Sequence, residues 1–190
     1  MKKFKKLIFY IKAWIICKKF NIKNYTINSD MSISVDGNVD LSGRDLKYIP
    51  IKFKEVSGYF YCHNNQLTSL EYCPETVGGH FSCSNNQLTS LKYCPEVIGR
   101  GFWWCGNNQL TNFDGLPEFF EQHISLEGNP VDKIYCLFKE DPRCIYWLRE
   151  YDVIRGNIVI RDRLEEVLHT LDMNIPDNLE QLLGPYYLIQ

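Results

Sequence analysis

The fold of this chain is decided by GYFYCHNNQLTSLEYCPETVGG, residues 58–79, which returns almost unchanged as GGHFSCSNNQLTSLKYCPEVIG, residues 78–99. Matching residues such as Cys62 and Cys83 lie 21 positions apart. A third copy, GRGFWWCGNNQLTNF at 99–113, follows at a spacing of 22. Degraded copies flank these at 38–49 and 123–134, so the array covers about 38–134 in roughly five units.

Each unit has the pattern of one coil of a solenoid. A short strand comes first, so Phe81 and Cys83 are predicted to point inward while His80 and Ser82 point outward. Asn86 and its counterparts follow at a turn, where a buried amide can bond free backbone groups. The Pro-x-x-Val segment then returns on the other side, and the coils stack because one unit cannot bury its apolar face alone. The pattern predicts an α/β solenoid with short parallel strands.

The repeated cysteines fit this stack without disulfides. Cys62, Cys83 and Cys105 form one predicted inward column, and Cys73 and Cys94 form a second. Neighbouring parallel strands lie about 4.8 Å apart, whereas a disulfide needs converging Cβ atoms about 3.8 Å apart. Reduced thiols are therefore expected, which favours a cytoplasmic location. A straight column also offers no tetrahedral metal site.

The unit NNQLTSLEYCPETVGG resembles the leucine-rich repeat proteins of tailed bacteriophages and related mobile elements. The preceding segment, residues 23–58, is similar to the segment with which such arrays usually begin. The resemblance implies a leucine-rich repeat array, a phage origin and a location in the host cell cytosol. It implies little about activity, because such proteins are mostly binding scaffolds. The strand GFWWCG, residues 101–106, departs from the family in its aromatic bulk.

The segments outside the array are predicted to cap its two ends. Residues 1–37 include a helix over about 3–20 with an apolar face expected to dock on the array, with a partner or a membrane surface as alternatives. This face is formed by Phe4, Leu7, Ile8, Ile11, Trp14 and Ile15. Residues 135–190 lose the period and are predicted to form a small helical cap, with helices at about 141–151, about 160–172 and from Asp177. The predicted domains are 1–37, 38–134 and 135–190.

Outward positions of the strands supply the candidate site. Alternate residues bring rings and imidazoles to the predicted concave face, namely Tyr59, Tyr61, His63, His80, Phe102, Trp104 and His123, with Glu127 at its edge. Aromatic side chains clustered on a rigid surface are typical of protein-binding hot spots. Two alternatives stay open: an end segment covers the rings, or the strand register slips by one residue and the rings are core.

We therefore expect a non-enzymatic scaffold that binds a protein partner through this face, with Trp104, Tyr61 and Tyr59 as anchors. Given the resemblance to phage proteins, the expected partner is a host protein such as a defence component. No cofactor and no small-molecule substrate are expected. The sequence contains no phosphate-binding loop, no HExxH motif and no spaced set of nucleophile and base. His63, His80 and His123 are not expected to converge on a metal.

Charge supports a second class of function. The net charge is −2, yet residues 1–24 hold eight lysines and no acid, so residues 25–190 sum to −10 (−2 minus +8). The lysine-rich helix is therefore an alternative site for nucleic acid or an anionic membrane. The apolar run from Leu7 to Cys17 is interrupted by Lys12, is too short to span a bilayer and lacks a cleavage site, so no secretory signal is expected.

A third possibility is an enzyme whose activity resides in residues 135–190. The chain is weakly similar to bacterial secreted effectors that carry repeats followed by a ubiquitin-ligase domain with a catalytic cysteine. Here Cys136 and Cys144 lie in IYCLFKEDPRCIYW without a Cys-x-Asp motif, and the segment is short for such a domain. The sequence therefore favours the binding scaffold over this enzyme.

Overall fold

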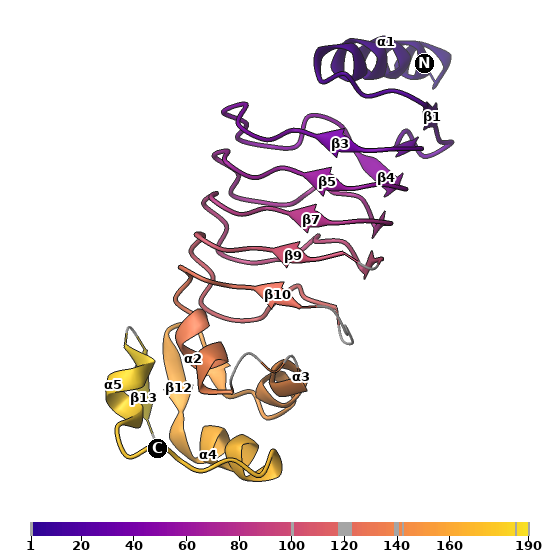
Figure 1. Ribbon diagram of the computed structural model, residues 1–190. Helices are drawn as coiled ribbons and strands as arrows, with labels where there is room; N and C mark the ends of the chain where they lie inside the picture. Colours follow the sequence, from indigo (N-terminus) through magenta and orange to yellow (C-terminus); the bar gives the residue numbers. More distant parts are fainter. Residues whose placement is uncertain are drawn as a thin grey trace.

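The computed structural model describes residues 2–99, 101–117, 123–138, 141, 143–184 and 186–189. The chain winds into a β-solenoid of about four turns built from stacked parallel strands. A helix lies at one end of the stack and a segment of helices and strands lies at the other (Figure 1). The predicted solenoid is therefore confirmed.

The first of the two solenoid sheets contains one strand from each sequence repeat. Its strands follow the order β3 (Val39–Asp40), β5 (Phe60–Tyr61), β7 (Phe81–Ser82), β9 (Trp103–Trp104) and β10 (Ile124–Ser125). All pairs are parallel and in register, so repeat-related residues face one another across the whole sheet. Inward residues such as Phe81 and Cys83 are fully buried, which confirms the predicted register.

A second sheet runs along the other side of the coils, where the sequence predicts only a returning segment. Its order is β1 (Tyr25–Ile27), β2 (Ile33–Val35), β4 (Phe53–Val56), β6 (Thr76–Val77) and β8 (Val97–Ile98), with β1 antiparallel and the others parallel. The residues Val56, Val77 and Ile98 occupy equivalent positions and are buried. A β-branched residue at this repeat position suits a strand that packs inward.

Four asparagines join the coils from within, at Asn65, Asn86, Asn108 and Asn129. The Asn86 amide nitrogen donates to the carbonyl of Cys83 in its own coil at 2.9 Å and to that of Cys62 in the preceding coil at 3.1 Å. Its Oδ1 accepts the N–H of Leu67, also in the preceding coil, at 2.9 Å. The structural role predicted for these asparagines is confirmed, and we call the four the asparagine ladder.

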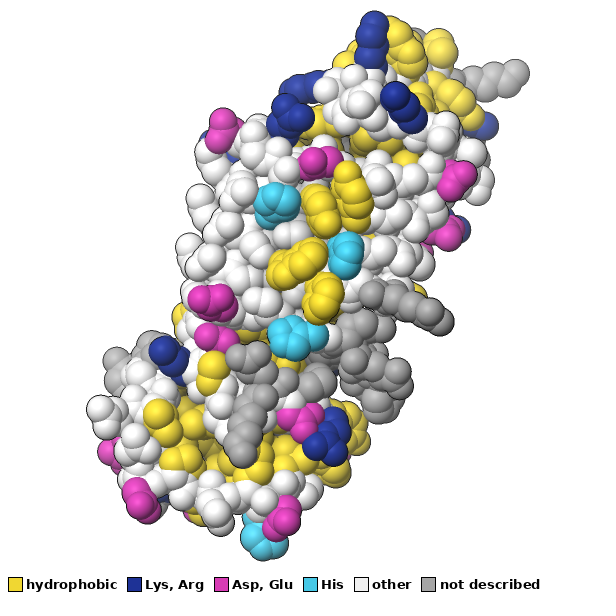
Figure 2. Space-filling model, in the orientation of Figure 1, with side chains coloured by type: hydrophobic (Ala, Val, Ile, Leu, Met, Phe, Trp, Pro, Cys, Tyr) yellow, Lys and Arg dark blue, Asp and Glu magenta, His cyan; other side chains and the backbone are white. Residues whose placement is uncertain are grey.

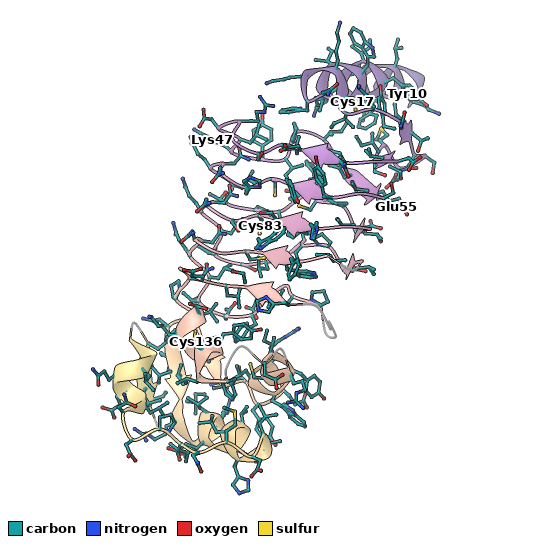
Figure 3. All side chains as sticks on the ribbon, in the orientation of Figure 1. Tyr10, Cys17, Lys47, Glu55, Cys83 and Cys136 are labelled. Carbon is teal, nitrogen blue, oxygen red and sulfur yellow. The ribbon has the colours of Figure 1, made fainter. Side chains whose placement is uncertain are left out.

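Thiols fill the interior beside this ladder. Cys62, Cys83 and Cys105 are fully buried and remain reduced, as do Cys73 and Cys94 with under a tenth of their surface exposed. Figure 3 shows Cys83 inside the stack. Hydrogen bonding to Cys105 and burial raise the pKa of the Cys83 thiol. Burial is the main cause that raises the pKa of the Cys73 thiol, and a hydrogen bond with the Cys62 thiol adds to it, so the two columns face each other.

The helix at the start of the chain, α1 (Lys2–Lys19), is present as predicted. The prediction of which of its faces docks on the array is wrong. Its buried side chains are Ala13, Ile16, Cys17 and, just beyond the helix, Phe20. The predicted docking residues point to solvent instead, with exposed fractions of 51–59% for Leu7, Ile8, Ile11, Trp14 and Ile15. The side chain of Phe4 lies outside the described part. A helical wheel marks both sides of α1 as apolar and so does not decide between them, and the side that carries Ala13, Ile16 and Cys17 is the one that joins the core.

The C-terminal segment contains the three predicted helices, which correspond to α3, α4 and α5, together with a helix, α2, and a sheet that the sequence did not predict. Its helices are α2 (Asp132–Leu137), α3 (Arg143–Glu150), α4 (Arg161–Thr170) and α5 (Leu179–Leu183). Between and after them, β11 (Ile154–Arg155), β12 (Ile158–Ile160) and β13 (Tyr187–Ile189) form a three-stranded sheet. The prediction of an all-helical C-terminal segment is therefore wrong. Within the described residues, no helix is both long and apolar enough to cross a membrane.

Candidate functional site

The outward side of the first sheet carries the predicted site. In-register pairing places Tyr61 of β5, Ser82 of β7 and Trp104 of β9 in one row across the strands. Residues immediately before each strand, among them Tyr59, His80 and Phe102, form a second outward row because side chains alternate along a strand. The sheet therefore gathers on one face residues that are far apart in the sequence.

One group of rings comes from the second coil. Tyr59 stacks on Tyr61 with ring centroids 4.2 Å apart. The Tyr61 ring in turn meets the edge of the His63 ring at 5.5 Å. Burial is the main cause that raises the pKa of Tyr61, with Tyr59 and Asp40 adding to it, so its phenol is uncharged at neutral pH.

A second group comes from the next coils. Phe102 stacks on Trp104 at 5.6 Å and contacts His123 at 6.4 Å. The His80 ring lies 5.8 Å from Phe102 and 5.2 Å from Trp104. His80 is also fixed through its Nδ1, which accepts the backbone N–H of Phe102 at 3.0 Å. With Nδ1 as an acceptor, neutral His80 carries its proton on Nε2.

Ser82 allows the two groups to meet. Its small side chain lies between Tyr61 and Trp104, whose strands are separated by β7. Strands two positions apart are about 9.6 Å apart, yet the centroids of these two rings approach to 6.4 Å. The rings lean over Ser82 and leave only 5% of it exposed. A larger residue at this position would keep the two groups apart.

Seven of the eight predicted side chains thus form one connected set of rings, which we call the ring network: Tyr59, Tyr61, His63, His80, Phe102, Trp104 and His123. Figure 2 shows a strip of hydrophobic and histidine side chains along this face. Phe102 is 50% exposed, and the other six are exposed or half-buried. The register-slip alternative is therefore wrong, because these rings are not core.

The eighth predicted residue, Glu127, lies two residues after β10 and is exposed, but it is not part of the ring network. At the opposite end of the face, Asp40 lies in register with Tyr61. Burial opposes ionisation of Asp40, but hydrogen bonds from Ser42, together with the charges of His63 and Arg44, outweigh it and lower its pKa. The ring network is therefore flanked by two acidic groups.

Sequence reasoning identified the rings but missed two features of the site. It did not foresee that Ser82 lets rings from separate strands converge, although a small residue between two aromatic rows is a readable signal. It also missed the bond from the Phe102 backbone to His80, since hydrogen bonds between coils depend on register. In the described part of the chain, the buried Nδ1 of His63 has no hydrogen-bond partner.

Other parts of the molecule offer less for chemistry. Among the described residues, no group of three or more His, Cys, Asp or Glu side chains is arranged to hold a metal ion. A groove of about 600 Å³ lies between α2 and α5 and is lined by Cys136, Leu137, Leu182 and others. Among the described residues, its lining includes Lys133 and Cys136 but no histidine or carboxylate, although the carboxylate of Asp132 lies 3.7 Å from the Cys136 Sγ.

No protein-family model, no curated protein and no solved structure matches this chain.

Proposed function

We propose that this protein is a non-enzymatic scaffold that binds another protein through the ring network. The observation that carries the proposal is the set of seven touching rings on the outward face of an in-register sheet. Partly exposed aromatic side chains, held by a rigid support, lose little conformational freedom on binding and bury much apolar area.

The dimensions of the face suit a protein rather than a small molecule. The rings span from β5 to β10, three strand spacings, or roughly 14 Å. That length matches the central part of a standard interface, in which apolar anchors are surrounded by a polar rim. Asp40 and Glu127 supply acidic groups at the two ends, so we expect a partner with an apolar patch and basic residues beside it.

The resemblance of the repeat unit to phage leucine-rich repeat proteins extends the proposal. It directs the search to bacterial cytosolic proteins, with host defence components first. In the same proposal, α1 and the C-terminal segment act as caps, since both contribute buried side chains to the apolar core that includes the coils. Caps hold the end coils in place and so keep the ring network rigid.

The test is comparative affinity purification from bacterial cells with three proteins. These are the wild-type chain, the double variant that combines Tyr61→Ala and Trp104→Ala, and the single variant Tyr48→Ala. Tyr48 is 71% exposed and lies outside the ring network, so it is a matched aromatic control. We expect a partner that the wild type and Tyr48→Ala enrich equally and that the double variant loses. Equal enrichment by all three proteins, with the double variant folded by circular dichroism, would exclude the ring network as the binding surface.

A further inference from the structure

Helix α1 has two apolar faces, of which only one is used by the fold. Ala13, Ile16 and Cys17 on one face are buried in the core. The opposite face exposes five large apolar side chains, Leu7, Ile8, Ile11, Trp14 and Ile15, with exposed fractions of 51–59%. These residues recur at spacings of three, four and seven and so form one continuous stripe. A continuous stripe of exposed apolar side chains on a protein surface indicates an interaction site.

Lysines border the stripe. Lys5, Lys12 and Lys19 are seven residues apart and therefore lie along one side of it. The Nζ of Lys18 lies 5.1 Å from the centre of the Trp14 ring, so a charge also lies at the end of the stripe. The helix contains no acidic residue, whereas residues 25–190 carry a net charge of −10 (−2 minus +8). The exposed apolar helix face thus lies on the part of the chain that is rich in lysine and free of acidic residues.

We propose that this face of α1 binds the surface of an anionic lipid bilayer, with the helix axis parallel to the membrane plane. The apolar stripe enters the boundary between headgroups and acyl chains, and the lysines contact anionic headgroups. Nucleic acid would use the lysines but would leave five exposed apolar side chains in water, so the stripe favours lipid. Repulsion between lysine-rich copies likewise disfavours self-association through α1.

The arrangement leaves the ring network accessible. Figure 1 shows α1 beyond the first coil, at the end of the stack, while the strands that carry the rings lie along the stack. Figure 2 shows lysine and hydrophobic side chains together at that same end. A membrane-bound molecule therefore still presents its rings to a protein. This site is independent of the proposed function, because it uses none of the residues of the ring network.

The experiment is co-sedimentation of the full chain with vesicles of phosphatidylcholine alone and with vesicles that contain roughly 30% phosphatidylserine. Ile11→Ser with Trp14→Ser removes apolar side chains and keeps every charge. Lys5→Gln with Lys12→Gln removes charge and keeps the stripe. All four residues are exposed, so both variants should keep the wild-type circular dichroism spectrum. Tyr48→Ser, which removes an exposed ring elsewhere, is the control.

We expect the wild type and Tyr48→Ser to bind the anionic vesicles at least about tenfold more tightly than the neutral ones, and each double variant to lose at least about tenfold in affinity. Salt at about 0.5 M should weaken the binding. The proposal is overturned if the wild type binds neither kind of vesicle, or if Ile11→Ser with Trp14→Ser binds as well as the wild type. It is also overturned if duplex DNA binds more tightly than the vesicles, or if the stripe instead holds a dimer that the serine variant dissolves.

Discussion

Replacement of Asn86 by alanine tests how the coils are joined. The Asn86 side chain makes three short hydrogen bonds, to the carbonyls of Cys62 and Cys83 and from the N–H of Leu67. Asn86 is only 9% exposed, so alanine leaves these backbone groups without water to replace the lost bonds. At about 1 to 1.5 kcal/mol for each of the three bonds, the free energy of unfolding should fall by roughly 3 to 4.5 kcal/mol.

The assay is urea-induced unfolding followed by circular dichroism, with Gln87→Ala as the matched control. Gln87 is the next residue and is exposed, so its replacement should change the free energy of unfolding by less than about 0.5 kcal/mol. Asn86→Asp keeps the acceptor for Leu67 but sets a carboxylate beside two carbonyl oxygens, so we expect it to destabilise at least as much as alanine. A loss below about 1 kcal/mol for Asn86→Ala, or equal losses for Asn86→Ala and Gln87→Ala, would refute the asparagine ladder.

The buried thiols and a close backbone contact between the coils lead to three further predictions. Iodoacetamide should label exposed Cys136 in the native protein and reach Cys83 only on unfolding, as judged by mass spectrometry; early labelling of Cys83 would contradict the register. Burial raises the pKa of Cys17 from 9.0 to about 11, so the contribution of Cys17 to the free energy of unfolding should fall between pH 9 and 11. Urea titrations should show a shallower fall over that range in Cys17→Ala than in the wild type, and equal slopes would contradict the burial of this thiol. Gly99→Ala should lower the free energy of unfolding by about 1 to 3 kcal/mol in the same urea titrations, because the added Cβ would lie 2.0 Å from the carbonyl oxygen of Gly78. An unchanged unfolding midpoint would refute this close contact between the coils.

The repeat made the solenoid predictable. A period of 21 aligns residues such as Cys62 and Cys83, and alternation along a strand then decides which side chains are buried. The same reasoning identified the rings, because Tyr61 and Trp104 occupy outward positions in register. Their contact at 6.4 Å could not be predicted, since it depends on how far two side chains lean across Ser82.

The end segments were harder to predict because no repeat constrains them. Helix α1 is apolar on both sides, so a helical wheel cannot decide which side is buried; the buried side is the one with Ala13, Ile16 and Cys17. Strand β13 pairs with β12 in parallel, across an intervening stretch that includes α4 and α5. Pairing between such distant segments depends on tertiary contacts that leave no local pattern in the sequence.

Site-specific photo-crosslinking tests the binding face most directly. A photoreactive phenylalanine analogue replaces Phe102, which is 50% exposed in the ring network, or Tyr93, which is 52% exposed outside the ring network. In bacterial cells, the probe at position 102 should form a covalent adduct with one discrete protein, and Trp104→Ala should abolish it. The probe at position 93 should form no such adduct. An adduct from position 93 alone, or none from position 102, would contradict the assignment of the ring network as the binding surface.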